Sequence, residues 1–252
     1  MRGDPGRWVA RALLTLALGL SGSSIATRMS VARDEGPCPD GMALVEGRAC
    51  VDLFEAHLVR VGSDGGVLAL HPPNEPVGSH RVRAVSARGA RPQAHVSRDE
   101  AAAACTEAGK RLCAPTEWLA ACKGPSATRY PYGVRRRSGA CNDRGVEPLS
   151  RVLRQPTSAA TWGFEAMNDP RLYLVPGAVA RSGRFDRCRS EVGAFDMVGN
   201  LHEWTAEPTG VMRGGYYLDT DGLGEGCEYA AIGHSATYRD YSTGFRCCAD
   251  PR

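Results

Sequence analysis

One stretch of the chain has a clear helical period, between residues 97 and 109. Ser97 is a favourable N-cap residue, and Glu100 three positions later completes a capping box. Small apolar side chains then recur every three or four positions, at Ala101, Ala104, Cys105 and Ala108. Gly109 ends the pattern, as glycine commonly does just past a helix. The pattern predicts a helix with one face packed on a core.

A second, shorter helix is predicted directly after the first. Thr116 is placed to cap residues 117–122, and Gly124 closes the segment. We expect the side chains of this helix to serve the core and a cross-link, with no part in chemistry. They are Trp118, Leu119 and Cys122.

Alternation of apolar and polar residues predicts strands near the start of the domain. Residues 38–50 have the pattern of strand, glycine turn and strand, and residues 51–61 that of a strand with one buried face. Residues 62–94 are rich in Gly, Pro, Arg and Ser, and we expect a surface excursion there. Residues 134–190 have little periodicity and are predicted to form a long loop region, which needs a cross-link inside a compact domain.

The N-terminus has the pattern of a secretory signal. Arg2, Arg7 and Arg11 precede a short apolar run at residues 12–20. Residues 24–26 then offer a small-x-small cleavage site. The run is too short to span a bilayer as a stable helix, which needs about 20 apolar residues. An uncleaved N-terminal anchor is the alternative.

This signal sets the expected organisation. Residues 1–26 are predicted to be a signal peptide, 27–37 a flexible lead, and 38–252 one domain. The chain would be exported, to the periplasm or outside the cell, with no membrane span after cleavage. Ten cysteines, an even number in an exported chain, then predict five disulfides. Zinc binding is the competing interpretation, but no pair of C-x2-C knuckles exists.

Charge argues against nucleic acid as a partner. The formal net charge of +3 falls to about +1 once residues 1–26 are removed. Binding to nucleic acid or to a membrane surface would require a clustered basic face. The three arginines at 135–137 are most simply a solvated loop.

The run DMVGNLHEWT at residues 196–205 has neither a helical nor a strand period. It places the oxygen donors Asp196, Asn200 and Glu203 close together beside a turn-forming glycine. This composition is typical of a loop folded onto itself, and hard oxygen donors at this density suit a cation such as calcium.

The same run is one of several blocks in a fixed order. The others are VSRDEA at 96–101, GKRLCAPTEW at 109–118, YPYG at 130–133, RGGYY at 213–217 and GFRCCAD at 244–250. Together these blocks resemble the formylglycine-generating enzyme (sulfatase-modifying factor) family over about residues 96–250. The resemblance implies that family's irregular α+β fold, similar to C-type-lectin-like folds, here as a single disulfide-stapled domain.

The resemblance also bears on the disulfides. It implies that Cys105 pairs with Cys247 and Cys122 with Cys227. We further expect Cys38 to pair with Cys50 across a short loop, Cys141 with Cys188, and Cys113 with Cys248 by elimination. A swap of Cys247 and Cys248 between Cys105 and Cys113 stays open, because adjacent residues cannot be separated from the sequence.

The family's copper chemistry is not expected in this chain. Family enzymes oxidise a substrate cysteine using copper held by two thiolates, which lie shortly after a Gly-Gly-Ser-Tyr element, and soft thiolates select Cu(I). Here Gly214-Gly-Tyr-Tyr217 is followed by no cysteine before Cys227, which matches a bridge cysteine. Iron is not expected either, because the six histidines show no ligand spacing. We therefore assign no catalytic residue.

Calcium is the cofactor that the resemblance favours. In the family, the loop matching residues 196–203 binds Ca²⁺, which implies carboxylate ligands from Asp196 and Glu203 and carbonyl ligands from Gly199 and Leu201. The alternative is that the two carboxylates cap turns or pair with arginines such as Arg213 or Arg246.

These observations predict a non-catalytic, calcium-stabilised binding or structural module of the cell envelope. Its groove would lie between residues 216 and 242, where acidic and aromatic side chains gather, and would take a peptide, a glycan or an envelope protein. The groove residues are Tyr217, Asp219, Asp221, His234 and Tyr238. The alternative is a non-haem metal-dependent oxidoreductase of the same superfamily with unrecognised ligands.

Overall fold

The computed structural model describes residues 36–153 and 163–252, which belong to the compact unit Glu35–Arg252. The predicted signal peptide and residues 27–35 of the predicted lead lie outside the described residues. No helix in the described part of the chain is both long and apolar enough to cross a membrane.

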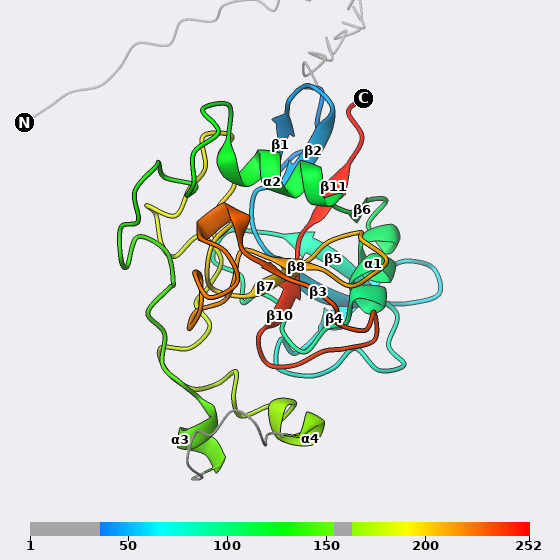
Figure 1. Ribbon diagram of the computed structural model, residues 1–252. Helices are drawn as coiled ribbons and strands as arrows, with labels where there is room; N and C mark the ends of the chain where they lie inside the picture. The colour runs from blue at the N-terminus through cyan, green and yellow to red at the C-terminus, as the bar shows by residue number, and fades with distance from the viewer. Residues whose placement is uncertain (1–35, 154–162) are drawn as a thin grey trace, which may run out of the picture. The chain divides into compact units, whose positions relative to one another are not determined.

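Three small sheets organise this unit (Figure 1). The first is antiparallel, in the order β1 (Met42–Val45), β2 (Ala49–Asp52), β11 (Cys247–Ala249) and β6 (Arg111–Leu112). The second has the order β4 (Val67–Leu70), β3 (Ala56–Val61) and β5 (Val82–Ser86). The third has the order β10 (Thr243–Phe245), β7 (His202–Trp204), β8 (Met212–Arg213) and β9 (Ala230–Ala231), with β10 parallel to β7. Strands from both ends of the described chain therefore meet in the first sheet.

The helices begin where local hydrogen bonds allow. Helix α1 (Arg98–Glu107) has the predicted capping box, in which Ser97 accepts from the Glu100 N–H and Glu100 accepts from the Ser97 N–H. Helix α2 (Pro115–Lys123) begins two residues earlier than expected. The prediction of Thr116 as its cap is wrong, because Glu117 bonds the Ala114 N–H and a proline suits the first helical position. The short helices are α3 (Leu149–Leu153), α4 (Phe164–Met167) and the 3-10 turn η1 (Gly226–Glu228).

Two strand predictions need correction. Residues 51–61 do not form one strand, because β2 ends at Asp52 and β3 begins at Ala56 in another sheet. Residues 62–94 are not merely a surface excursion, since β4 and β5 flank β3. Val82 and Ala84 of β5 are buried against α1, whereas all four residues of β4 are exposed. The predicted hairpin in residues 38–50 is confirmed as β1 and β2.

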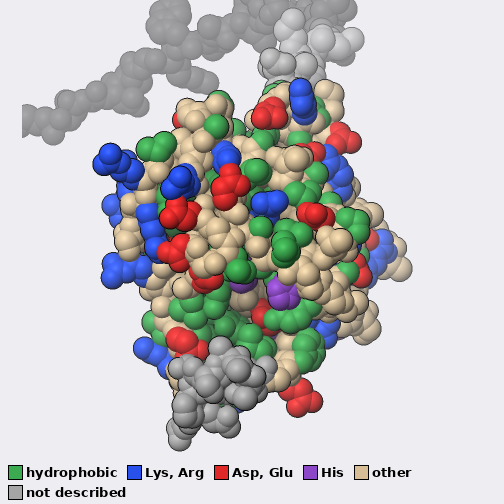
Figure 2. Space-filling model, viewed as in Figure 1, with side chains coloured by type: hydrophobic (Ala, Val, Ile, Leu, Met, Phe, Trp, Pro, Cys, Tyr) green, Lys and Arg blue, Asp and Glu red, His purple; other side chains and the backbone are tan. Residues whose placement is uncertain are grey.

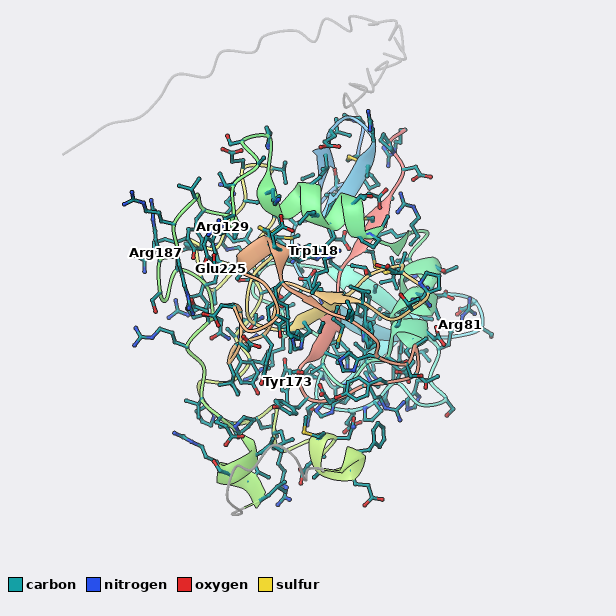
Figure 3. The ribbon with its side chains drawn as sticks, viewed as in Figure 1. Arg81, Trp118, Arg129, Tyr173, Arg187 and Glu225 are labelled. Atoms are coloured by element: carbon teal, nitrogen blue, oxygen red, sulfur yellow. A yellow bond between two sulfur atoms is a disulfide. The ribbon has the colours of Figure 1, made fainter. Side chains whose placement is uncertain are left out.

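The core has two main parts. One lies between α1 and the second and third sheets, around Leu58, Trp204 and Phe245. The other surrounds Trp118 of α2, which is fully buried together with six cysteines, as predicted for Trp118 and Cys122. Figure 3 labels Trp118 on α2 in the interior. Sulfur bridges thus replace part of the aliphatic packing that a domain of this size needs.

Five disulfides cross-link the unit with the predicted pairings. They are Cys38–Cys50, Cys105–Cys247, Cys113–Cys248, Cys122–Cys227 and Cys141–Cys188. The adjacent Cys247 and Cys248 point to opposite faces of β11, as neighbours on a strand must, and so reach different partners. The last bridge anchors the largely irregular segment 134–190, of which α3 and α4 are the only helices among the described residues.

Candidate functional site

The loop from Asp196 to Glu203 runs through the interior, and all of its residues are buried. Asp196 and Asn200 have positive φ angles of 56° and 59°, and Gly199 has 76°. A Cβ on Gly199 would lie 2.2 Å from the carbonyl oxygen of Asn142, so only glycine allows the two backbones to approach this closely. The polar groups of the loop must therefore find their partners inside the protein.

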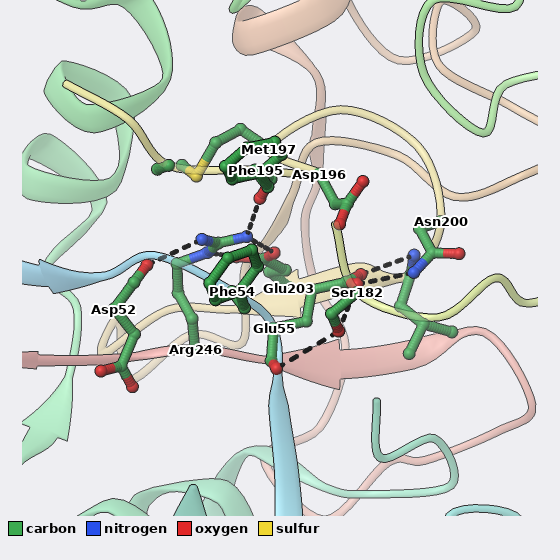
Figure 4. Close-up of polar contacts among 12 residues, drawn as sticks. Asp52, Phe54, Glu55, Ser182, Phe195, Asp196, Met197, Asn200, Glu203 and Arg246 are labelled. Carbon is green, nitrogen blue, oxygen red and sulfur yellow. Dashed lines mark hydrogen bonds and ion pairs between the residues drawn. The ribbon is translucent and has the colours of Figure 1, made fainter. Parts of the chain in front are cut away.

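Glu203 finds its partners in Arg246 and Trp118. The Arg246 guanidinium donates from Nη2 to Glu203 Oε1 over 2.6 Å and from Nε to Oε2 over 2.7 Å. The Trp118 indole N–H donates to the same Oε2 over 2.7 Å. The remaining Arg246 donors reach the carbonyls of Asp52 and Phe195 (Figure 4). Arg246 is fully buried, and these bonds to Glu203 and to the two carbonyls use four of its five N–H groups.

A second carboxyl pair lies beside this ion pair. Burial, with the charges of Asp196 and Glu203, raises the pKa of Glu55 well above its usual range. Burial also raises the pKa of Asp196, to about 6, although the Gly183 N–H donates to it over 2.6 Å. Glu55 accepts from the Asn200 amide over 2.6 Å, and Ser182 lies near the same oxygen (Figure 4). Sequence reasoning missed Glu55, because it lies 145 positions from Asn200 and no local motif marks it.

The expected calcium ligands are only partly gathered. Both oxygens of Glu203 bond Arg246, as the alternative interpretation proposed, and one oxygen of Asp196 bonds Gly183. Across residues 36–153 and 163–252, no group of three or more His, Cys, Asp or Glu side chains is arranged to hold a metal ion. A calcium ion bound here would have to share the Glu203 carboxylate with Arg246. Calcium binding by Asp196, Gly199, Leu201 and Glu203 stays a prediction.

The cysteines leave no thiolate for copper. Each of the ten forms a disulfide, and the segment between Tyr217 and Cys227 contains none. Cys227, at its end, is bridged to Cys122. The residues present therefore do not fit a bis-thiolate copper centre.

A row of hydrogen bonds joins two carboxylates through His202. The Tyr229 hydroxyl donates to Asp219 over 3.0 Å and lies 3.3 Å from His202 Nε2. On the other side, His202 Nδ1 lies 3.3 Å from the Ser242 hydroxyl, which donates to Asp240 over 2.7 Å. Burial lowers the pKa of His202 to about 4, so the ring is neutral near pH 7. A neutral ring has one N–H, which can donate to one of these hydroxyls, while its other nitrogen can only accept.

The predicted groove residues lie at different depths around this row. Tyr217 is fully buried and forms part of the core, so it does not line a groove. Asp219 and Tyr238 are half-buried, and the Tyr238 hydroxyl donates to Asp240 over 2.5 Å. His234 stacks on Tyr238 with ring centroids 4.7 Å apart. Asp221 is exposed; its side chain pairs with Arg136 over 2.5 Å, and its backbone N–H donates to Asp219 over 3.1 Å.

Asp219 and Asp240 share one feature of interest for binding. Their oxygens accept only from hydroxyls and backbone N–H groups, and neither forms an ion pair with a described lysine or arginine. Figure 2 shows histidine side chains in a depression near the middle of the face, with acidic side chains close by. His202, Ser242 and Asp240 were not predicted as site residues. Only the fold brings β7 beside β10 and so joins them.

Comparison with known proteins places these features in a family. A family model described as "Sulfatase-modifying factor enzyme 1-like domain" matches residues 54–251. The Major Tropism Determinant P3c variant is a solved structure with 18% identity and a TM-score of 0.48, covering 87% of this chain and 55% of that one. This chain thus spans about half the length of that protein.

Two further solved structures have similarly low sequence identity to this chain and similar TM-scores. PvdO from Pseudomonas aeruginosa has 12% identity and a TM-score of 0.44, covering 80% of this chain and 94% of that one. Treponema denticola variable protein 1 has 12% identity and a TM-score of 0.44, covering 85% of this chain and 100% of that one. The family match confirms the resemblance drawn from the ordered sequence blocks, and the α+β fold agrees with it.

Proposed function

Because this chain belongs to the family of sulfatase-modifying factor enzyme 1-like domains, we propose that it is a member without the family's thiolate copper chemistry. It acts instead as an exported binding or structural module of the cell envelope. The observation that carries this proposal is the state of the cysteines. All ten are consumed in disulfides, so no thiolate pair is left to hold copper. Five disulfides also favour an oxidising compartment outside the cytoplasm.

The surface around the His202 row is the proposed binding site. Asp219 and Asp240, two carboxylates that pair with no lysine or arginine in the described part of the chain, flank a neutral imidazole. Tyr238 and His234 offer aromatic faces beside them. Tyrosine and histidine bring a large contact area at little cost in side-chain entropy, and carboxylates accept hydrogen bonds from hydroxyls, amides or amines. Such a surface suits a peptide or a glycan that presents donor groups.

Arrays of peptides and glycans probed with the purified protein test this site. We expect the arrays to identify a ligand whose affinity is about tenfold or more lower for Asp219→Asn or Tyr238→Ala. The reason is that one buried hydrogen bond to a charged group contributes about 1.5–3 kcal/mol. The matched control is Asp40→Asn, which removes an exposed carboxylate far from Asp219 and Tyr238 in the sequence. This variant should bind as the wild type does. A ligand that both groove variants bind unchanged would move the site elsewhere.

Metal analysis and an activity assay separate this proposal from the oxidoreductase alternative. Stoichiometric iron or copper on the purified protein, or oxidation of a cysteine-containing peptide in the presence of Cu(I), would overturn the non-catalytic assignment. We propose calcium as the one stabilising ion, held by the loop from Asp196 to Glu203, and its test is argued at the end of the Discussion.

A further inference from the structure

We propose that a second surface of this domain, made of arginines from two loops joined by the Cys141–Cys188 disulfide, binds an anionic polysaccharide. The ligand class is a glycan chain that carries sulfate or uronic-acid carboxylate groups. This surface is separate from the His202 row, and the proposal does not rest on the function proposed for that row.

The two loops are rich in exposed arginines. The first contributes Arg135, Arg136, Arg137 and Arg144, and the second Arg181, Arg184, Arg187 and Arg189. Only one exposed acidic residue, Asp186, lies within these two stretches, since Asp143 is buried. The sequence predicted a plain solvated loop at 135–137, because each stretch alone is short.

The fold brings the two stretches together. The Cys141–Cys188 bridge holds the two Cα atoms 4.7 Å apart. The Arg187 guanidinium lies 3.4 Å from the carbonyl oxygen of Gly139 in the other loop. Lysine and arginine side chains gather along this side of the molecule in Figure 2, where Figure 3 labels Arg187. The two arginine-rich stretches, which are separate in the sequence, therefore form one continuous basic surface in the fold.

Several of these guanidinium groups have no partner among residues 36–153 and 163–252. Arg136 pairs with Asp221 and Asp143, Arg181 donates to a backbone carbonyl, and Arg189 lies over the Phe195 ring. The others include Arg135, Arg137, Arg144 and Arg184, whose side chains form no hydrogen bond or ion pair with any described residue. Like charges held side by side, with no acidic partner in the described part of the chain, create a positive potential that attracts an external anion.

The shape of the surface favours a narrow polymer. Asn142 and residues 177–181, 184 and 185 line a cavity of about 390 Å³. Arg181 and Arg184 bring charge to it, while Val179 and Phe185 contribute apolar contact. Guanidinium groups bind carboxylate and sulfate oxygens in pairs, and an aromatic ring packs well against the face of a sugar. A sugar chain can enter this cavity, whereas a flat bilayer cannot.

The test compares two double variants of equal charge. Arg137→Gln/Arg184→Gln removes one unpaired guanidinium from each loop, whereas Arg48→Gln/Arg151→Gln removes two exposed guanidiniums elsewhere. Binding of a sulfated glycan (heparin) and of polygalacturonate is measured by calorimetry at about 0.15 M salt. We expect the first variant to bind about fivefold more weakly than the wild type, the control within about twofold, and affinity to fall as salt rises.

Three outcomes would overturn the proposal. The first is equal loss in both variants, which would show attraction by net charge alone. The second is tighter binding to anionic phospholipid vesicles, or to a DNA duplex, than to either glycan at the same salt. The third is no glycan binding by the wild type. Thermal melting of both variants checks that the fold, held by its disulfides, is intact.

Discussion

Arg246 lies near the buried carboxyl groups of Glu203, Asp196 and Glu55, and its single positive charge cannot balance all of them. It forms direct ion-pair bonds with Glu203 only, while its charge also acts on Asp196 and Glu55. Burying an unpaired charge is costly, so the two remaining groups tend toward their neutral forms. Beside the satisfied pair of Arg246 and Glu203, therefore, Asp196 and Glu55 are two buried carboxyl groups with raised pKa values.

This arrangement predicts a specific pH dependence of stability. The pKa of Asp196 is about 6 in the folded protein and ordinary, near 3.8, in the unfolded chain. Its contribution to stability is therefore fully present below about pH 4 and is lost as pH rises toward 6, by about 3 kcal/mol. We expect Asp196→Asn to flatten the wild-type decline between pH 4 and pH 6, measured by urea unfolding with disulfides intact.

The comparison of the two proteins isolates Asp196 from the other titrating groups, which are common to both. Glu55 titrates in the same direction, so some decline with pH should persist in the variant. If the free energies of unfolding of wild type and variant run parallel from pH 4 to pH 7, the carboxyl group of Asp196 is not shifted.

Elements differ in how far the sequence alone reveals them. Helix α1 was predicted because its capping box and its small apolar face are both local. Strands β4 and β5 were missed because their residues are few and lie among glycines and prolines, so that only pairing with β3 makes them strands. The carboxyl cluster was half predicted, since Glu203 belongs to a recognisable motif, whereas Glu55 reaches it only through the fold.

The bridges stabilise these short elements in proportion to the loops that they close. Cys122–Cys227 ties α2 to η1 across 105 positions, and Cys38–Cys50 closes only 12. We expect Cys122→Ala/Cys227→Ala to lower the free energy of unfolding by about 2–5 kcal/mol. Cys38→Ala/Cys50→Ala is the matched control, and it should lose less because the chain entropy that a cross-link removes grows with the loop. Urea unfolding measures both, and an equal or larger loss in the control would contradict this reasoning.

At the scale of the whole domain, surfaces are harder to predict than the core. The net charge of about +1 without residues 1–26 gave no hint of a basic face, because arginines on one side are offset by acidic residues elsewhere. A disulfide between distant positions creates that face, and composition does not encode which loops it joins. The two proposed surfaces, the acidic one at the His202 row and the arginine one made by loops 135–144 and 181–189, differ in charge and would therefore take different ligands.

Calcium provides a test that reports on the whole domain. If the loop from Asp196 to Glu203 binds the ion only when folded, calcium at a hundredfold excess over its dissociation constant should add about 2.7 kcal/mol of stability. Chelator should then lower the melting temperature, and Glu203→Ala should abolish the response to calcium. Trp204, adjacent to Glu203, should report binding through its fluorescence.

If calcium does not stabilise the protein, the structure offers a definite explanation. Arg246 already neutralises Glu203 with two hydrogen bonds, so the loop has an internal cation in place of a bound one. In that case calcium and chelator leave the melting temperature unchanged, whereas Arg246→Met, which leaves Glu203 buried and uncompensated, costs about 3–5 kcal/mol. Measuring the calcium response in the wild type and the stability of the arginine variant together therefore decides which cation organises this loop.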